Sequence, residues 1–186
     1  MNFLAKIYER TSQIALRKLE SDHNYKFIRD TYLFQDLSPE ALHFVLSRLI
    51  ERRYTSDELI FKQDNPSVCL FIVKRGGVEV YFSRGDDDKI IVQTVAACEL
   101  FGEISVISST YRTATAKALE NDTVLLTLSS FDLDELSQVY PQDGLKVLRG
   151  ITDTIISYLD NTTKKLRLAT IDVQTLTDKL ADYERG

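Results

Sequence analysis

The sequence has few cysteines and no excess of positive charge. Its 186 residues include only two cysteines, Cys69 and Cys98. Two cysteines cannot form the disulfide framework of a small secreted domain, and they indicate a reducing compartment. The net charge of −5 lacks the basic excess that nucleic acid-binding proteins direct at phosphates. Both shortages disfavour a disulfide-rich secreted protein and a general DNA- or RNA-binding protein.

Histidine is equally scarce. His23 and His43 are the only two, and both lie in stretches with helical patterning, before the β-rich region. A cupin-type metalloenzyme needs several histidines inside its barrel, so that class is not expected. The sequence also offers no Ser-His-Asp, Cys-His or metal-ligand cluster. We therefore predict that the chain is not an enzyme and has no metal and no cofactor.

Long apolar runs are absent as well. No run approaches the ~20 residues that cross a bilayer, and the N-terminal segment meets charge too early for a signal peptide. With 44% hydrophobic and 27% charged residues, the chain can bury a core and stay soluble. These features predict a cytoplasmic protein with one globular domain, helical extensions and no membrane partner.

The two ends of the chain have helical patterning. Residues 1–32 form a predicted helical extension, which either packs on its own domain or binds a partner. A second helix begins at Ser38-Pro39, since serine suits an N-cap and proline the first helical position. Ser129-Ser130 begins a short helix that ends before Pro141.

Between these helices the pattern changes to short β-type runs from Arg52 to Leu128. The predicted strands, separated by turns, cover residues 58–62, 70–73, 78–82, 90–92 and 124–126. The acidic segment 85–88 is predicted as a hairpin tip. The spacing predicts an α+β fold, an antiparallel β-roll (jelly-roll-like) flanked by N-terminal helices and a long C-terminal helix. The expected domain boundaries are 1–32, 33–140 and 141–186.

A long helix is predicted from about Leu145 onward. Its apolar residues follow a heptad register, which favours a helix–helix seam and hence a homodimer; they are Leu145, Leu148, Ile155, Leu159, Leu166, Ala169, Val173, Leu176 and Leu180. The alternative is a helix lying on its own barrel. Thr162 interrupts the stripe.

The most informative stretch is residues 101–116, FGEISVISSTYRTATA. Gly102 permits close approach of a ligand to the backbone, and a helical turn from Glu103 to Ile107 offers free N–H groups to an anion. Arg112 follows nine residues after Glu103 and suits phosphate oxygens. A carboxylate beside an anion is tolerable if it accepts a hydroxyl from the same molecule, which Glu103 would do.

This stretch resembles the phosphate-binding cassette of the cyclic nucleotide-binding family, found in catabolite-activator-type regulators, cyclic nucleotide-dependent kinases and gated channels. The resemblance implies that Glu103 accepts the ribose 2′-hydroxyl and Arg112 pairs with the phosphate, while nearby backbone amides complete the cradle. Thr113 hints at cGMP without excluding cAMP. The ligand-binding residues implied are Gly102, Glu103, Ile104, Ser105, Arg112, Thr113 and Ala114. On the long helix, Thr162 and Thr163 either contact the purine or interrupt the seam.

The sequence departs from this family at its turns. Family glycines are replaced by Asp57, by Asp64 or Asn65, and by Cys98, and Ser109 also stands where a glycine is common. Too few residues follow Asp172 for a helix-turn-helix, so no DNA binding by this chain is expected. We predict a cAMP or cGMP sensor that signals through a protein effector. The alternative is a ligand-free dimeric scaffold in which Glu103 and Arg112 pair with each other.

Overall fold

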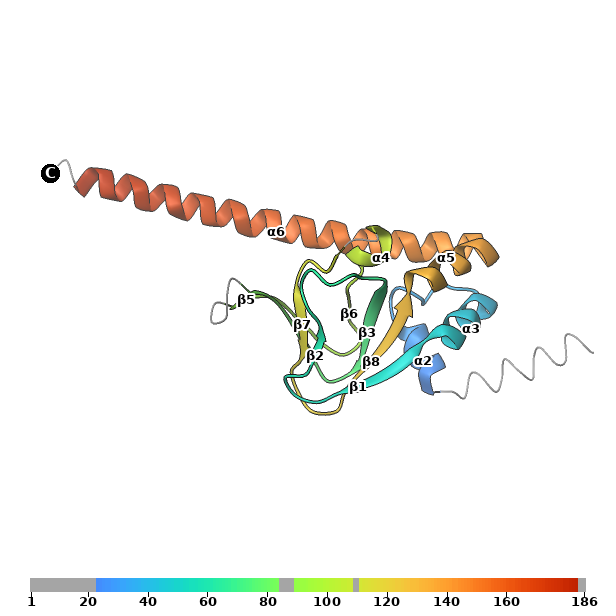
Figure 1. The fold of residues 1–186 in the computed structure, drawn as a ribbon. Coiled ribbons are helices and arrows are strands. Elements are labelled where there is room, and N and C mark those ends of the chain that lie inside the picture. Colours follow the sequence, from blue (N-terminus) through green and yellow to red (C-terminus); the bar gives the residue numbers. More distant parts are fainter. Residues whose placement is uncertain (1–22, 84–88, 109–110, 184–186) are drawn as a thin grey trace, which may run out of the picture. The chain divides into compact units, whose positions relative to one another are not determined.

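The fold is described from a computed structural model, which covers residues 23–83, 89–108 and 111–183 (Figure 1). The chain divides into two compact units, residues 1–148 and 149–186. The elements, in chain order, are α2 (His23–Asp30), α3 (Pro39–Arg48), β1 (Ile50–Tyr54), β2 (Leu59–Phe61), β3 (Cys69–Arg75), β4 (Val78–Ser83), β5 (Lys89–Val95), β6 (Leu100–Phe101), α4 (Ile104–Ser108), β7 (Thr115–Ala118), β8 (Thr123–Ser129), α5 (Ser130–Val139) and α6 (Pro141–Tyr183).

The strands of the first unit form two antiparallel sheets, with strand orders β1-β8-β3-β6 and β2-β7-β4-β5. Their inner faces bury a common apolar cluster, as in other packed sheets; it comprises Tyr54, Phe71, Val73, Val78, Val95, Phe101, Ala116, Ala118 and Leu125. Strand β8 is buried on both faces, because Leu126 and Leu128 on its opposite face are also buried. The predicted antiparallel β-roll with flanking helices and a long C-terminal helix is confirmed.

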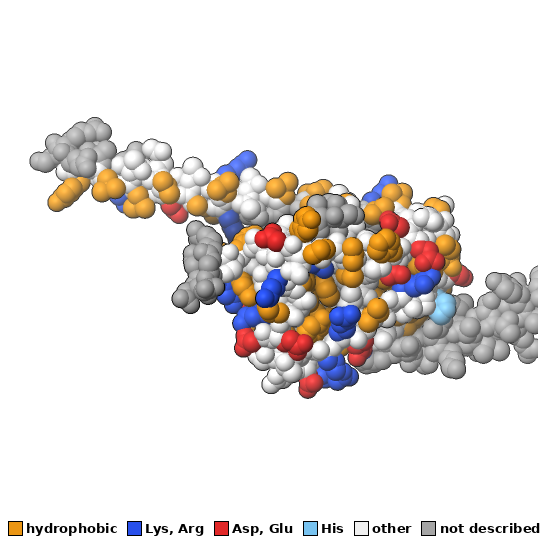
Figure 2. Space-filling view, viewed as in Figure 1, with side chains coloured by type: hydrophobic (Ala, Val, Ile, Leu, Met, Phe, Trp, Pro, Cys, Tyr) orange, Lys and Arg blue, Asp and Glu red, His pale blue; other side chains and the backbone are white. Residues whose placement is uncertain are grey.

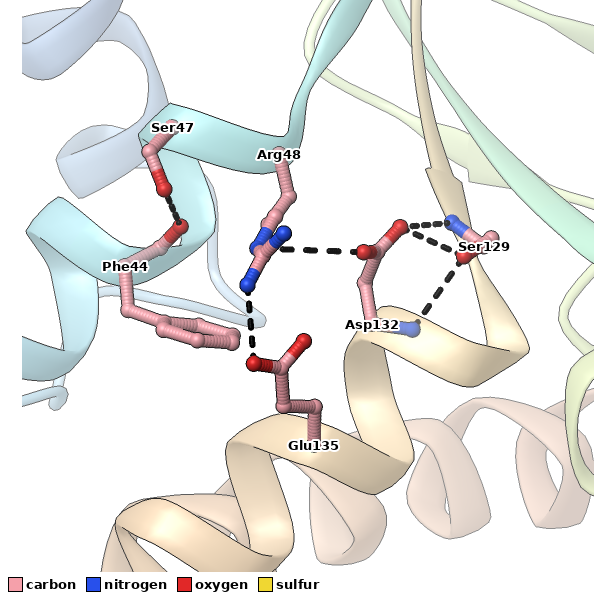
Figure 3. Close-up of polar contacts among 6 residues, drawn as sticks. All are labelled: Phe44, Ser47, Arg48, Ser129, Asp132 and Glu135. Atoms are coloured by element: carbon pink, nitrogen blue, oxygen red, sulfur yellow. Dashed lines mark hydrogen bonds and ion pairs between the residues drawn. The ribbon is translucent and has the colours of Figure 1, made fainter.

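Polar contacts join the helices that flank the roll (Figure 3). The predicted helix start at Ser38-Pro39 is confirmed, with the Ser38 hydroxyl accepting from the N–H of Ala41 at 3.3 Å. At the other end of α3, Arg48 donates to Glu135 of α5 at 2.8 Å. Ser129 begins α5 in a capping box with Asp132, whose carboxylate also lies 4.0 Å from Arg48. The end of β8 is thereby fixed to two helices.

The first turn of α6 is held to the start of α3. Asp143, only 6% exposed, accepts from the Ser38 hydroxyl at 2.6 Å and from the Ser38 backbone N–H at 3.2 Å. Lys146 donates to the same carboxylate at 2.8 Å. Asp143 precedes Leu145 and already belongs to α6, so the helix starts before the predicted position near Leu145 and at the expected boundary of residue 141. The helix begins at Pro141, where proline needs no N–H partner.

Three strands were not predicted from the sequence. Strand β1 carries adjacent charged residues, β6 has two residues, and β7 overlaps the end of the cassette stretch. Each is short or polar and is stabilised by pairing with a neighbouring strand rather than by its own pattern. The predicted hairpin tip at 85–88 and residues 1–22 of the N-terminal extension lie outside the described residues. Within the described residues, no helix has both the length and the apolar composition of a membrane span.

The replaced glycines occupy left-handed backbone positions. Asp57 and Asp64 both have φ of 64°, and Cys98 has φ of 71°. The predicted equivalence with family glycines is therefore supported at all three positions, and at the second it is Asp64 rather than Asn65. Aspartate tolerates this conformation because its short side chain can bond locally, whereas cysteine has no such compensation. The turn at Cys98 is held by its N–H, which donates to the Val73 carbonyl at 2.8 Å.

The variant Cys98→Gly should be more stable than the wild type. Removing the Cβ relieves about 1–2 kcal/mol of left-handed strain, and greater freedom of the unfolded chain offsets about 0.4–1 kcal/mol of that gain. A net gain of about 0.5–1 kcal/mol in unfolding free energy is expected from urea denaturation. The control Asp57→Gly should gain less, because it also loses the contact of Asp57 with Lys117. A less stable Cys98→Gly protein would contradict this account.

Candidate functional site

The site begins at Gly102, directly after β6. Gly102 has φ of +79°, and a Cβ at this position would lie 2.5 Å from Nη1 of Arg112. A side chain is therefore excluded both by the backbone conformation and by the arginine. The Gly102 carbonyl accepts a long hydrogen bond from the same Nη1 at 3.4 Å. The absence of a side chain at Gly102 thus lets the guanidinium of Arg112 approach closely, and the approach of a ligand to this backbone stays a prediction.

The backbone of Arg112 is held by the turn between β2 and β3. Its carbonyl accepts from the N–H of Asp64 at 2.9 Å, and its own N–H donates to the Asn65 carbonyl at 2.9 Å. The left-handed conformation of Asp64 shapes this turn. The two hydrogen bonds bring Arg112 beside a segment that lies about fifty positions earlier in the chain.

The guanidinium of Arg112 is buried, with 5% of the residue exposed. Nη2 donates to the carbonyl of Cys69 at 2.8 Å, and the group lies over the ring of Phe61, 4.0 Å from its centroid. Burial lowers the pKa of Arg112 to about 10, and nearby Cys69 and Glu103 oppose that shift. Arg112 therefore remains a cation at neutral pH.

Glu103 is the second buried charged group, with 4% of the residue exposed. Burial raises its pKa, while its own backbone N–H and the charge of Arg112 act in the opposite direction. No ion pair joins Glu103 to Arg112 among the described residues, whose salt bridges all involve other groups. This geometry weighs against the scaffold alternative, in which the two side chains neutralise each other.

The remaining predicted residues differ in their surroundings. Ile104 is 41% exposed and Thr113 is exposed, whereas Ala114 is 6% exposed. Ser105 lies in α4, which begins at Ile104 rather than at Glu103 as predicted. The side chain of Ser105 and the whole of Ser109 lie outside the described residues.

Thr162 and Thr163 lie on α6, within the second unit. Thr162 is exposed and Thr163 is half-buried. Their contact with a purine stays a prediction.

Three residues next to Arg112 were not found from the sequence. Phe61 and Phe71 face the guanidinium, and Cys69 contributes its backbone carbonyl. A carbonyl has no sequence signal, because every residue carries one. The two phenylalanines looked like ordinary core residues of strands. Only the register of the strands reveals that their rings face a cation.

Comparison with known proteins shows which family this chain matches. Residues 51–140 match the family described as cyclic nucleotide-binding domain. The chain is 27% identical to potassium channel AKT2 of Oryza sativa subsp. japonica over 123 residues, which is 66% of this chain and 14% of the channel. It is 31% identical to human cyclic nucleotide-gated channel beta-1 over 134 residues, 70% of this chain and 10% of that protein. The cyclic AMP receptor protein of Thermus thermophilus is 33% identical over 96 residues, 52% of this chain and 44% of the receptor.

Each of these matches spans less than half the length of the relative. Among solved structures, the Thermus thermophilus catabolite activator protein has a TM-score of 0.64 at 28% identity, covering 74% of this chain and 62% of that one. The regulatory domain of Toxoplasma gondii PKA, solved with cAMP, has a TM-score of 0.55 at 20% identity and shows the shared fold. It covers 63% of this chain and 46% of that one.

Glu103→Gln should stabilise the fold at neutral pH. Because burial raises the pKa of the folded carboxyl, the unfolded chain loses this proton first, and stability falls as pH rises through the folded-state pKa. The neutral amide has no such penalty. At pH values above the folded-state pKa of Glu103, the variant should therefore gain on the order of 1 kcal/mol in unfolding free energy. Urea denaturation between about pH 4 and pH 8 measures the difference, which should grow with pH and then level off.

The exposed Glu120→Gln is the matched control for the loss of a surface carboxylate, and its stability should stay close to that of the wild type. If Glu103→Gln is less stable than the wild type at neutral pH, the carboxylate is stabilised by its surroundings and this reading of the site is wrong.

Proposed function

Residues 51–140 belong to the cyclic nucleotide-binding domain family, and we therefore propose that this chain senses cAMP or cGMP and passes the signal to a protein partner. The observation that carries the proposal is the buried Arg112, which has hydrogen bonds to two carbonyls and no carboxylate partner among the described residues. A buried cation without an ion-pair partner favours an anionic ligand.

The arrangement of donors suits a cyclic phosphate. A guanidinium carries five N–H groups, and two of those of Arg112 are used on the carbonyls of Gly102 and Cys69. Among the described residues the others donate to no acceptor, and they would be available to phosphate oxygens. Glu103 would accept the ribose 2′-hydroxyl, which relieves the desolvation of its carboxylate. The amides near Gly102, Ser105 and Thr113 would complete the cradle.

The proposed ligand is one of two cyclic nucleotides, cAMP or cGMP. Thr113 follows Arg112 in the chain and is exposed, and a hydroxyl at this position would favour a guanine without excluding an adenine. The matched relatives include both a cyclic AMP receptor protein and the human cGMP-dependent protein kinase 2. The domain itself acts as a regulator. It would change the behaviour of an attached or associated protein rather than catalyse a reaction.

Direct binding tests the proposal. Calorimetry should show one nucleotide site per chain, and Arg112→Leu should weaken affinity about 10–150-fold, the value of a charge-assisted hydrogen bond. Arg53→Leu makes the same change at an arginine whose side chain is 65% exposed, and its affinity should match the wild type. If the wild-type chain binds neither nucleotide at millimolar concentration, the sensor function is wrong and the scaffold alternative stands.

The second part of the proposal is that α6 forms a parallel homodimer. Figure 2 shows apolar side chains recurring along this helix, and Leu159, Leu166 and Leu176 are each at least 60% exposed. These residues continue the heptad register predicted from the sequence. Soluble monomers seldom expose an apolar stripe of this length, whereas a second copy would bury it in a coiled-coil seam. Thr162, which interrupts this stripe, or its neighbour Thr163 would contact the purine in this proposal.

Leu159→Asp combined with Leu166→Asp should convert the dimer to a monomer, because charges in the seam cannot be desolvated. Light scattering on the wild type should give about twice the chain mass and on the variant a single mass. Leu168 is also 64% exposed but lies off the heptad line, so Leu168→Asp should remain dimeric. A wild-type chain that is monomeric at high micromolar concentration would rule out the dimer.

A further inference from the structure

Three phenylalanines form a cluster inside the roll, next to the site. The rings of Phe71 and Phe101 are stacked with centroids 5.0 Å apart, and Phe61 lies 5.6 Å from Phe71 and 5.9 Å from Phe101. Arg112 contacts two of these three rings. Its guanidinium lies 4.0 Å from the Phe61 centroid and 5.2 Å from that of Phe71. Phe61 is thus the nearer of the two rings.

The position of Phe61 relative to Arg112 follows from strand pairing. Phe61 ends β2 and pairs with Ala116 of β7, with a register shift between Leu59 and Phe61. In the turn that follows, the N–H of Gln63 donates to the Thr115 hydroxyl at 3.0 Å. The same turn holds the Arg112 backbone through Asp64 and Asn65. The segment 61–65 therefore carries the phenylalanine ring and also holds the backbone of Arg112. As a consequence, the ring and the guanidinium face each other.

An aromatic ring and a carboxylate hold a cation in different ways. A carboxylate would occupy N–H groups of the guanidinium and neutralise the charge that a phosphate needs. The π-face attracts the cation electrostatically and contacts its flat side, so the N–H groups at the edge stay available. At a site that is 5% exposed, this attraction is stronger than at the surface, because water does not compete.

We propose that Phe61 is the positioning residue for phosphate recognition: its ring fixes the plane of the Arg112 guanidinium and leaves the N–H edge directed at the anion. This inference rests on the proposed function, since the anion is the phosphate of a cyclic nucleotide. Phe61 does not contact the ligand in this role. It acts through Arg112, and Phe71 supports the same cation from a greater distance.

The test changes the π-electron density of the ring without changing its shape. Phe61→trifluorophenylalanine keeps the packing but withdraws π-density, and it should weaken cAMP or cGMP binding about three- to tenfold by calorimetry. Phe61→Leu, which removes the ring, should weaken binding about five- to thirtyfold. The matched control is Phe101→trifluorophenylalanine. Phe101 is in the same cluster but makes no cation–π contact with Arg112, so its affinity should equal that of the wild type.

The outcomes separate this inference from the proposed function. If the wild type binds nucleotide and the fluorinated Phe61 binds equally well, the ring only packs and the positioning role is wrong. If the fluorinated Phe101 weakens binding as much as the fluorinated Phe61, the effect is general to the cluster and the role is likewise wrong. If the wild type binds neither nucleotide, the proposed function fails, and the positioning role fails with it.

Discussion

The burial of the Arg112 guanidinium is the constraint on which the rest of the site depends. A cation that is 5% exposed loses most of its hydration, and burial accordingly lowers its pKa to about 10. The compensation comes from the carbonyls of Cys69 and Gly102 and from the faces of Phe61 and Phe71. Cys69 and Phe71 lie on β3, Phe61 ends β2, and Gly102 follows β6. A glycine at 102 is required because any Cβ would overlap the guanidinium.

The carbonyl that accepts from Arg112 is also linked to the helices. Cys69 pairs with Ser129 at the end of β8, and Ser129 begins α5 through its capping box with Asp132. The N–H of Ser130 donates to the Val68 carbonyl at 2.8 Å, which fixes the same strand end. From there, Arg48 connects α5 to α3, as Figure 3 shows. A change in the hydrogen bonding of Arg112 therefore acts on a strand end to which two helices are attached.

Glu103 and Arg112 form a pair of buried, opposite charges that do not neutralise each other by an ion pair among the described residues. Burial raises the pKa of the acid and lowers that of the base, so both ionised forms are disfavoured by the same cause. In the proposed complex, one ligand would relieve both penalties, with its phosphate at Arg112 and its hydroxyl at Glu103. Such a site sacrifices stability in the free protein for affinity in the complex.

The local pattern of the sequence was sufficient for the roll and for the helix starts at Ser38-Pro39 and Ser129-Ser130, whereas the resemblance to the family pointed to the left-handed turns at Asp57 and Cys98. These features depend on residues near one another in the chain, where periodicity and capping preferences act. The cassette residues Glu103 and Arg112 were found by spacing. Their burial, the carbonyl of Cys69 and the ring of Phe61 were decided only by the tertiary structure, because the pairing of β2 with β7 and of β3 with β8 joins residues more than forty positions apart, and no local pattern specifies such a register.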